Sequence, residues 1–343
     1  METNLSAEKA RERSREMRRT FERMTAFAKE NNVKAIIIAG DMFDTERVTS
    51  RTADFVLNTV SNAPEVDFLY LMGNHDDNAK VFGSENLPKN LKLFSDKWTT
   101  YRYDNVTVSG VELNEENQDS LYENLFLSAN DINIVTMHGQ TSTTTGAEEV
   151  CLNRLKNKNI RYLALGHIHS YRKEQLDLDG EWCYSGCLEG RGFDECGEKG
   201  FVLIETDADR LETQFVPFSQ RMLCEVAVDI SGITSVNDII IAAKEASKDI
   251  DSKNLVKFVL CGNYTLETQK DVLYIAEALQ DNFYFVKVKD ESKLKLDETD
   301  YSMDVSLKGE FIRAVMASDL SEEEKSQIIV SGLQALMGEE ITL

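Results

Sequence analysis

Short runs of consecutive apolar residues recur along the first part of the chain, and they constrain the fold more than any other feature. The first run, VKAIIIAG at 33–40, is apolar at successive positions and rich in isoleucine, as in a strand covered on both faces of its sheet. Comparable runs follow at 66–73, 105–111, 132–139, 160–167, 181–186 and 200–205. We therefore predict a strand at each of these positions, with the first one buried.

Helical patterns lie among these strands. The first covers 6–30, where apolar residues at 17, 21, 24 and 28 recur every three or four positions and therefore share one helix face. Residues 51–63 and 147–157 have similar patterns and are predicted to be helices as well. Helices between strands predict an α/β domain with the helices outside a sheet.

The pattern changes scale after Pro217, and we predict a domain boundary there, with one domain at 1–218 and a second at 219–343. Beyond the boundary, strand and helix patterns alternate at 224–230, 236–248, 254–262, 267–280 and 283–289. This alternation predicts a small α+β domain. Two more helices, at 309–318 and 321–337, are expected near the end, with a capping box of Ser321 and Glu324 on the second.

The cellular compartment is indicated by two negative features of the sequence. Nothing approaches 18 consecutive apolar residues, and the first residues are a charged helical pattern, so we expect neither a membrane span nor a signal peptide. The six cysteines are scattered without a CxxC pair, which is typical of reduced thiols. We therefore expect a cytoplasmic protein. For three of the cysteines a zinc site remains an open alternative, formed by Cys183, Cys187 and Cys196.

The net charge limits how the protein can meet nucleic acid. The formal charge is −22 at pH 7, whereas non-specific DNA affinity comes from phosphate neutralisation by lysine and arginine. The charge therefore argues against a surface that holds nucleic acid by bulk electrostatics. Any DNA contact must be local, or mediated by metal ions or by a partner.

Four polar motifs follow predicted strands and contain all four histidines of the chain. They are GDMFD at 40–44, GNHD at 73–76, MHG at 137–139 and GHIH at 166–169. Ligands of open α/β sheets gather at this edge, beyond the carboxyl ends of the strands. One such histidine alone is more often an ordinary hydrogen-bonded residue, but four together, joined by Asp41 and Asn74, favour a metal site.

The donor types indicate which metal and which chemistry. Carboxylate, amide oxygen and imidazole form a set suited to Mn²⁺, Fe or Zn²⁺, and unlike a closed thiolate zinc site. In an extended segment His167 and His169 point to the same side, so both can face one metal cluster.

The adjacent residues Asn74 and His75 must point in different directions. This separates a ligand, Asn74, from a free imidazole, His75, that Asp76 orients as a general acid. Phosphoester hydrolysis uses such equipment: a bridging carboxylate, two ions about 3.5–4 Å apart and an acid for the leaving oxygen.

In their order and spacing these motifs resemble those of the calcineurin-like metallophosphoesterases. Within that family the chain is similar to SbcD-type DNA repair exonucleases, because residues 184–205 resemble the segment that follows their last histidine motif. The resemblance implies a four-layer α/β sandwich, two mixed sheets flanked by helices, with a small α+β C-terminal cap domain. It also implies Mn²⁺-dependent cleavage of phosphodiester bonds at DNA ends, alongside an SbcC-like SMC-type ATPase.

The resemblance also implies a role for each motif residue. Asp41 would bridge two ions, and one ion would be completed by a set of three side chains, namely Asn74, His138 and His167. His169 would belong to the other ion. His75 would be the catalytic histidine, with Asp76 behind it.

The chain departs from this family at its beginning. The family opens with a strand that ends in Asp-x-His and supplies the remaining ligands of the ion served by His169, yet residues 1–40 contain neither Asp nor His. We expect that this first strand is lacking here, through a misassigned start codon or a truncated sequence. One ion would then be well held, the second site weak or empty, and the nuclease activity poor. A second copy, in a homodimer, could cover the resulting gap in the sheet.

The sequence leaves two other functions open. A phosphoesterase for small phosphate esters or cyclic nucleotides would use the same metal chemistry, and the negative charge favours it. A non-catalytic adaptor, whose C-terminal helices hold the ATPase, would explain the absent Asp-x-His motif.

Overall fold

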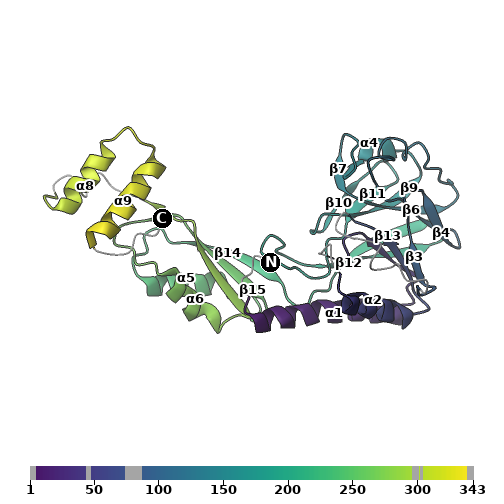
Figure 1. The fold of residues 1–343 in the computed structure, drawn as a ribbon, viewed down its shortest axis with the longest axis horizontal. Helices are drawn as coiled ribbons and strands as arrows, with labels where there is room; N and C mark the ends of the chain where they lie inside the picture. Colours follow the sequence, from purple (N-terminus) through teal and green to yellow (C-terminus); the bar gives the residue numbers. More distant parts are fainter. Residues whose placement is uncertain (1–4, 44–47, 74–86, 296–300, 302–303, 338–343) are drawn as a thin grey trace. The chain divides into compact units, whose positions relative to one another are not determined.

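A computed structural model describes residues 5–43, 48–73, 87–295, 301 and 304–337. The chain divides between Met222 and Leu223 into two compact units (Figure 1). The sequence pattern predicted a boundary between 218 and 219, in the same connection between two strands. Each unit is described by itself below.

Unit 1 contains the helices α1 (Ala7–Glu30), α2 (Ser50–Ser61) and α4 (Leu152–Leu155). Its strands are β1 (Ala35–Ala39), β2 (Asp67–Leu71), β3 (Leu91–Leu93), β4 (Thr99–Tyr103), β5 (Val106–Gly110), β6 (Ile132–His138), β7 (Gln140–Ser142), β8 (Glu149–Cys151), β9 (Ile160–Gly166), β10 (Arg172–Gln175), β11 (Glu181–Tyr184), β12 (Gly200–Asp207) and β13 (Arg210–Pro217). They form a three-stranded sheet, β1-β2-β3, and a six-stranded sheet, β10-β11-β9-β6-β5-β4. Two further pairs, β12-β13 and β7-β8, form separate two-stranded sheets.

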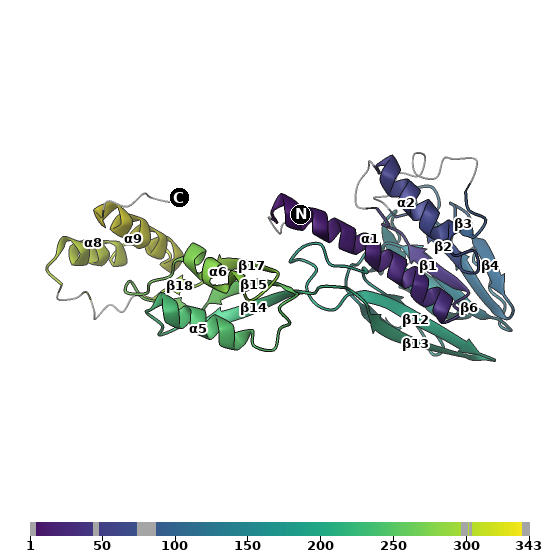
Figure 2. The ribbon, with the colours of Figure 1, turned by 90° about the horizontal axis from the view of Figure 1, so that it is seen from below.

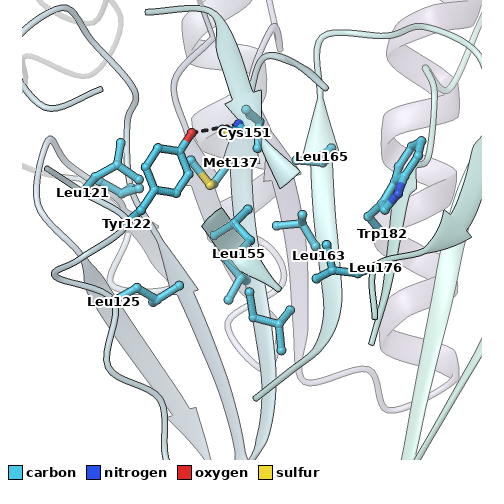
Figure 3. Close-up of a cluster of buried hydrophobic side chains, with 14 of the residues drawn as sticks. Leu121, Tyr122, Leu125, Met137, Cys151, Leu155, Leu163, Leu165, Leu176 and Trp182 are labelled. Atoms are coloured by element: carbon cyan, nitrogen blue, oxygen red, sulfur yellow. Dashed lines mark hydrogen bonds between the residues drawn. The ribbon is translucent and has the colours of Figure 1, made fainter. Parts of the chain in front are cut away.

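Three apolar clusters separate the layers of unit 1. One lies between the two sheets and includes Leu69 of β2 and Tyr162 of β9. The second packs α1 and α2 side by side on the outer face of the three-stranded sheet (Figures 1 and 2). The third covers the outer face of the six-stranded sheet with residues 111–127 and α4 (Figure 3). The predicted α/β class is therefore confirmed.

The first strand differs from its prediction. The run AIIIA of β1 was expected to be buried, but all five of its residues are only half-buried. Among the described strands, β1 is hydrogen-bonded to β2 alone and forms the edge of its sheet, whereas β2 in the middle is buried at four of its five positions. Edge position, and not composition, decides the exposure of these isoleucines.

The helix predicted at 147–157 was also wrong. The segment begins as strand β8, which pairs with β7, and only Leu152–Leu155 form a helical turn. The Cys151 N–H donates to the hydroxyl of buried Tyr122 at 2.9 Å, so this donor is used outside the segment (Figure 3). Because Val150 and Cys151 enter the core from an extended backbone, tertiary packing overrides the local helical pattern.

Helix α1 buries charged residues as well as its predicted apolar face. Arg13 and Glu16 are buried and joined at 2.6 Å, and Arg13 also reaches Glu189 at 3.1 Å. Arg221 binds Glu16 from the other side at 2.8 Å. This set of four residues, called here the α1 charge network, ties the helix to the turn at 189–191 and to the end of unit 1.

Unit 2 contains a three-stranded parallel sheet, β14 (Leu223–Asp229), β15 (Leu255–Cys261) and β17 (Phe285–Asp290), in that order. Helices α5 (Val236–Ala246) and α6 (Val272–Gln280) connect these strands and share a core with them (Figure 2). The short strands β16 (Asn263–Tyr264) and β18 (Lys293–Leu294) pair in parallel as a separate two-stranded sheet. Helices α8 (Leu307–Met316) and α9 (Glu322–Met337) follow, and Ser321 and Glu324 form the predicted capping box.

Within the described residues, no helix combines the length and the apolar character needed to span a bilayer.

Candidate metal centre

The carboxyl ends of three strands from two different sheets converge on one group of side chains. Asp41 follows β1 of the three-stranded sheet, His138 is the last residue of β6, and His167 follows β9. β6 and β9 are parallel neighbours, with His138 opposite Gly166. One ligand atom from each of Asp41, His138 and His167 lies within 4.8 Å of the others. Three of the predicted ligands are thus brought together.

Other predicted residues cannot be placed in the same way. Asn74, His75 and Asp76 follow β2 in sequence, but they lie outside the described residues. Their assignment as a ligand, an acid and its orienting carboxylate stays a prediction.

The orientation of His138 follows from one hydrogen bond across the sheets. Its Nδ1 lies 2.8 Å from the carbonyl oxygen of Ala39, the last residue of β1. A carbonyl can only accept, so Nδ1 carries the proton in the neutral ring and Nε2 keeps its lone pair. That Nε2 lies 3.3 Å from the Asp41 carboxylate. The buried ring is therefore fixed with its ligand nitrogen toward Asp41.

Two glycines make this close approach possible. A Cβ on Gly166 would overlap the carbonyl oxygen of Ala39, so any larger residue would push the two sheets apart. Gly40 has a φ of +93°, and a Cβ there would meet Nδ1 of His138. The glycine that opens GDMFD and the one that opens GHIH are thus required by the geometry around the ligands.

Asp41 and His167 adopt backbone angles that are unusual for residues with side chains. Their φ values are 51° and 101°, in the region that favours glycine. Such residues cost on the order of 1–3 kcal/mol each and persist where the surroundings hold them. The strain turns both side chains toward the same point.

The electrostatic setting of His167 favours a neutral ring. Burial lowers the pKa of this imidazole, and neighbouring His138 lowers it further, while Asp41 and Glu148 oppose the shift. Since a metal binds the neutral imidazole, the lowered pKa keeps His167 ready as a ligand at neutral pH.

The three side chains fit a divalent metal ion. One carboxylate oxygen and two imidazole nitrogens are the donor types that Mn²⁺, Fe and Zn²⁺ accept, and here they converge without help from a thiolate. The alternative zinc site is not supported. Among the described residues, Cys183, Cys187 and Cys196 do not form a metal-binding group, and the thiol of Cys196 donates to the Phe193 carbonyl at 3.2 Å.

His169 lies apart from this group. Its Nδ1 is 2.6 Å from Oε1 of Glu195, a buried carboxylate, and about a third of its side chain is exposed (34%). Burial raises the pKa of Glu195, but hydrogen bonds from His169 and from the Arg191 N–H outweigh it and lower this pKa to about 2. Ile168, between the two histidines, packs against the core of the six-stranded sheet.

Several residues near the site were not singled out from the sequence. The Tyr184 hydroxyl donates to the carbonyl of Gly139 and accepts from the N–H of Thr141, both at 2.8 Å, which fixes the turn after His138. Glu195 and Lys199 contact His169 from 26 and 30 residues further along the chain. All three lie in the stretch 184–205, which only the family resemblance marked.

Comparison with known proteins agrees with this geometry. Residues 13–171 match the family described as calcineurin-like phosphoesterases. The chain is similar to the DNA double-strand break repair protein Mre11 of Sulfolobus acidocaldarius, with 24% identity over 350 residues, covering 93% of this chain and 88% of that protein.

Two other relatives are matched over smaller shares of their length. The Mre11 protein of Methanosarcina acetivorans is 26% identical over 232 residues, which cover 62% of this chain and 37% of that protein. The uncharacterized metallophosphoesterase YhaO of Bacillus subtilis is 22% identical over 271 residues, or 73% of this chain and 66% of that protein.

The matched residues 13–171 run from α1 through the strands that carry Asp41, His138 and His167. The resemblance predicted from the four motifs is therefore confirmed. The chain contains a calcineurin-like metallophosphoesterase domain, and it is a hydrolase acting on phosphodiester bonds.

Proposed function

We propose that this protein is a metal-dependent nuclease that cleaves phosphodiester bonds at DNA ends, in the manner of an SbcD-type exonuclease. The observation that carries the proposal is the convergence of Asp41, His138 and His167 within 4.8 Å. A divalent ion held there would polarise the phosphoryl group and lower the pKa of bound water. Mn²⁺ is the ion we propose first, with Fe or Zn²⁺ as substitutes.

Each residue has a separate task in this proposal. His138 and His167 would supply imidazole nitrogens to one ion, together with Asn74, and Asp41 would contribute its carboxylate to this ion and to a second. His169 would serve the second ion. His75, oriented by Asp76, would donate a proton to the leaving oxygen.

DNA is the proposed substrate because two relatives of the chain carry the name of a DNA double-strand break repair protein. The net charge of −22 opposes bulk attraction to DNA, so contact would have to be local and carried by the metal site. Small phosphate esters are the alternative substrate, and a non-catalytic adaptor is the alternative role. A comparison of DNA cleavage with hydrolysis of a small diester separates these three outcomes.

The proposal extends to partner and location. We propose that the protein works with an SbcC-like SMC-type ATPase that presents the DNA end, and that it resides in the cytoplasm. None of the six cysteines, all of which lie in the described residues, forms a disulfide, which suits a reducing compartment. Homodimerisation would bring two metal sites to one DNA end.

The metal content of the 343-residue chain is expected to be uneven. One ion has four candidate ligands in this sequence, whereas the second has only Asp41 and His169. We therefore propose one firmly held ion per chain, a weak second site and impaired nuclease activity. Titration calorimetry with Mn²⁺ tests this: two tight equivalents per chain would contradict it.

The decisive test compares two substrates. Linear plasmid DNA and the small diester bis(p-nitrophenyl) phosphate are incubated with the protein and Mn²⁺. Slow but metal-dependent shortening of DNA is expected. Asp41→Asn should lower the rate by more than about 100-fold, beyond the effect of losing an outer-shell partner, because a ligand carboxylate becomes a neutral amide.

The controls separate site effects from general damage. Asp54→Asn removes an exposed carboxylate on α2 and should leave both activities unchanged. His75→Ala should lower DNA cleavage while the first Mn²⁺ still binds, because this residue is proposed as an acid and not as a ligand. Turnover of the diester without DNA cleavage would support the small-ester function, and turnover of neither would support the adaptor.

A further inference from the structure

We propose that Glu195 is the positioning residue of His169, fixing its proton on Nδ1 and presenting Nε2 as the ligand atom. This inference rests on the proposed function, because it takes His169 as a ligand of the second ion. It assigns a role to residues 187–199, which lie within the stretch 184–205 that the family resemblance marked.

Glu195 contacts the imidazole ring of His169 directly. Oε1 of Glu195 lies 2.6 Å from Nδ1 of His169. The other oxygen accepts the N–H of Arg191 at 2.7 Å, and the Arg191 guanidinium lies 3.5 Å from Oε1. A carboxylate that receives donors on both oxygens acts as an acceptor toward the imidazole. Nδ1 must then be the donor.

The backbone of His169 is held from the same stretch of chain. The carbonyl oxygen of His169 accepts a hydrogen bond from the Lys199 ammonium at 2.7 Å and another from the Cys187 thiol at 3.6 Å. Lys199 is almost fully buried, with 2% exposure, although it carries a charge. Burial of a lysine is costly unless it is hydrogen-bonded, so this contact is a fixed part of the structure. Ring and carbonyl of His169 are therefore held from the same stretch.

The second ring nitrogen of His169, Nε2, is the atom left for a metal. With Nδ1 engaged by Glu195, only Nε2 can offer a lone pair to a metal. The side chain of Glu195 is buried at 7% exposure, whereas that of His169 is 34% exposed. The imidazole is therefore held at Nδ1 by a buried carboxylate, while its side chain remains partly exposed. In metal sites generally, a carboxylate that accepts a hydrogen bond from the second ring N–H of a ligand histidine fixes the tautomer and the orientation of that ring.

A purely structural role for Glu195 is the competing explanation, since its bonds to Arg191 also shape the turn. Glu189 offers a matched control on the same stretch. It is equally buried, at 5% against 6% exposure, and equally tied to an arginine, but that arginine is Arg13 of α1. Glu189→Gln therefore removes a buried charge from the stretch without touching His169.

The test reads the tautomer directly. Metal-free protein labelled with ¹⁵N is observed in long-range ¹H–¹⁵N spectra of the imidazole rings at about pH 9, where imidazoles are in general neutral. The chain has only four histidines, and His169→Gln identifies the signal. Wild-type His169 should show a single Nδ1–H tautomer. Glu195→Gln should give a mixture, because the amide can present either its oxygen or its NH₂ group, and Glu189→Gln should keep the wild-type spectrum.

Two results would overturn the proposal. One is a wild-type His169 that carries its proton on Nε2, which needs no variant and so holds even where Glu195→Gln does not fold. The other is a folded Glu195→Gln protein with an unchanged His169 tautomer, since a structural role alone predicts that.

Activity is measured separately. With Mn²⁺ and bis(p-nitrophenyl) phosphate, Glu195→Gln should lower kcat by about 10–100-fold relative to Glu189→Gln, the usual effect of losing an outer-shell partner. A wild-type protein without turnover would count against the proposed function, while the spectra would still decide the position of the proton. An intact Nδ1–H tautomer in an inactive protein would thus separate the two failures.

Discussion

At the scale of single residues, the candidate centre depends on neighbours that carry no metal-binding chemistry themselves. The Ala39 carbonyl fixes the tautomer of His138, and the Tyr184 hydroxyl holds the turn that follows it. Gly166 leaves the space in which β1 approaches β9. The ligands are therefore positioned mainly by backbone groups of the two sheets, which do not depend on rotamer choice.

Gly166→Ala tests this dependence on close approach. The added Cβ would overlap the Ala39 carbonyl, a backbone atom that cannot move without its strand. We expect a loss of about 1–3 kcal/mol in the free energy of unfolding, the usual range for overpacking, measured by urea denaturation. Mn²⁺ affinity should fall as well, because Asp41 follows the displaced strand.

Gly146→Ala is the matched control for this change. The three atoms nearest to a Cβ there all belong to the side chain of Glu149, the first at 3.2 Å, so a shift of about a few tenths of an ångström relieves the contact. Equal stability losses in the two variants would argue against a special role of the contact between β1 and β9.

Part of this residue-scale picture could be predicted from sequence. The concentration of all four histidines in motifs after strands indicated a site, and the structure brings two of them together with Asp41. Glu195 and Lys199 could not be found in this way. Their partner lies 26 and 30 residues away, and neither periodicity nor spacing marks a contact made by a folded loop.

At the scale of elements, the sequence predicted the positions of the strands better than their burial and pairing. The parallel strands β6 and β9 fall where their apolar runs indicated. The half-exposure of β1 depends on its position at the edge, and β8 forms because Val150 and Cys151 enter a core built by distant residues. Both are tertiary effects that a local pattern does not contain.

The α1 charge network shows how an element can be fixed by buried charge. Burial raises the pKa of Glu16, but hydrogen bonds from Arg221 and Arg13 outweigh it, so the net pKa lies below the ordinary 4.5. A lowered carboxyl pKa contributes stability that is fully present above 4.5 and is lost as the pH falls through the folded-state pKa. The attachment of α1 should therefore weaken in acid.

Glu16→Gln makes this measurable. At pH 7 the variant should lose about 2 kcal/mol or more of unfolding free energy, because two arginines keep their charge without the carboxylate. The difference from wild type should shrink as the pH falls from 4.5 through the lower folded-state pKa, at which wild-type Glu16 itself becomes protonated. Urea denaturation at several pH values gives both quantities. Glu22→Gln, on an exposed position of the same helix, should show neither effect.

At the scale of the whole molecule, the chain consists of two units with separate cores. The described metal-binding group lies entirely in unit 1, and unit 2 has its own apolar cluster around β15 and its own helix pair. Both tryptophans of the protein, Trp98 and Trp182, belong to unit 1. Tryptophan fluorescence therefore reports on unit 1, whereas far-ultraviolet circular dichroism reports on both.

Mn²⁺ should stabilise one unit selectively. Binding to the folded state at 100 times the dissociation constant adds about 2.7 kcal/mol, which raises the midpoint of the fluorescence transition on heating. Circular dichroism should then show a second transition whose midpoint Mn²⁺ leaves unchanged. A metal-induced shift of equal size in every transition would contradict independent units, and Asp41→Asn should abolish the shift in fluorescence.

The positive φ angles of Asp41 and His167 place two opposing selective pressures on the same codons. For folding alone, glycine would be the better residue at position 167, since it adopts a φ of 101° without penalty. For catalysis, only a side chain with a lone pair is of use there. Under relaxed selection for activity, substitutions at these strained positions would therefore be favoured first. The protein would then become more stable as it lost the ability to bind its metal.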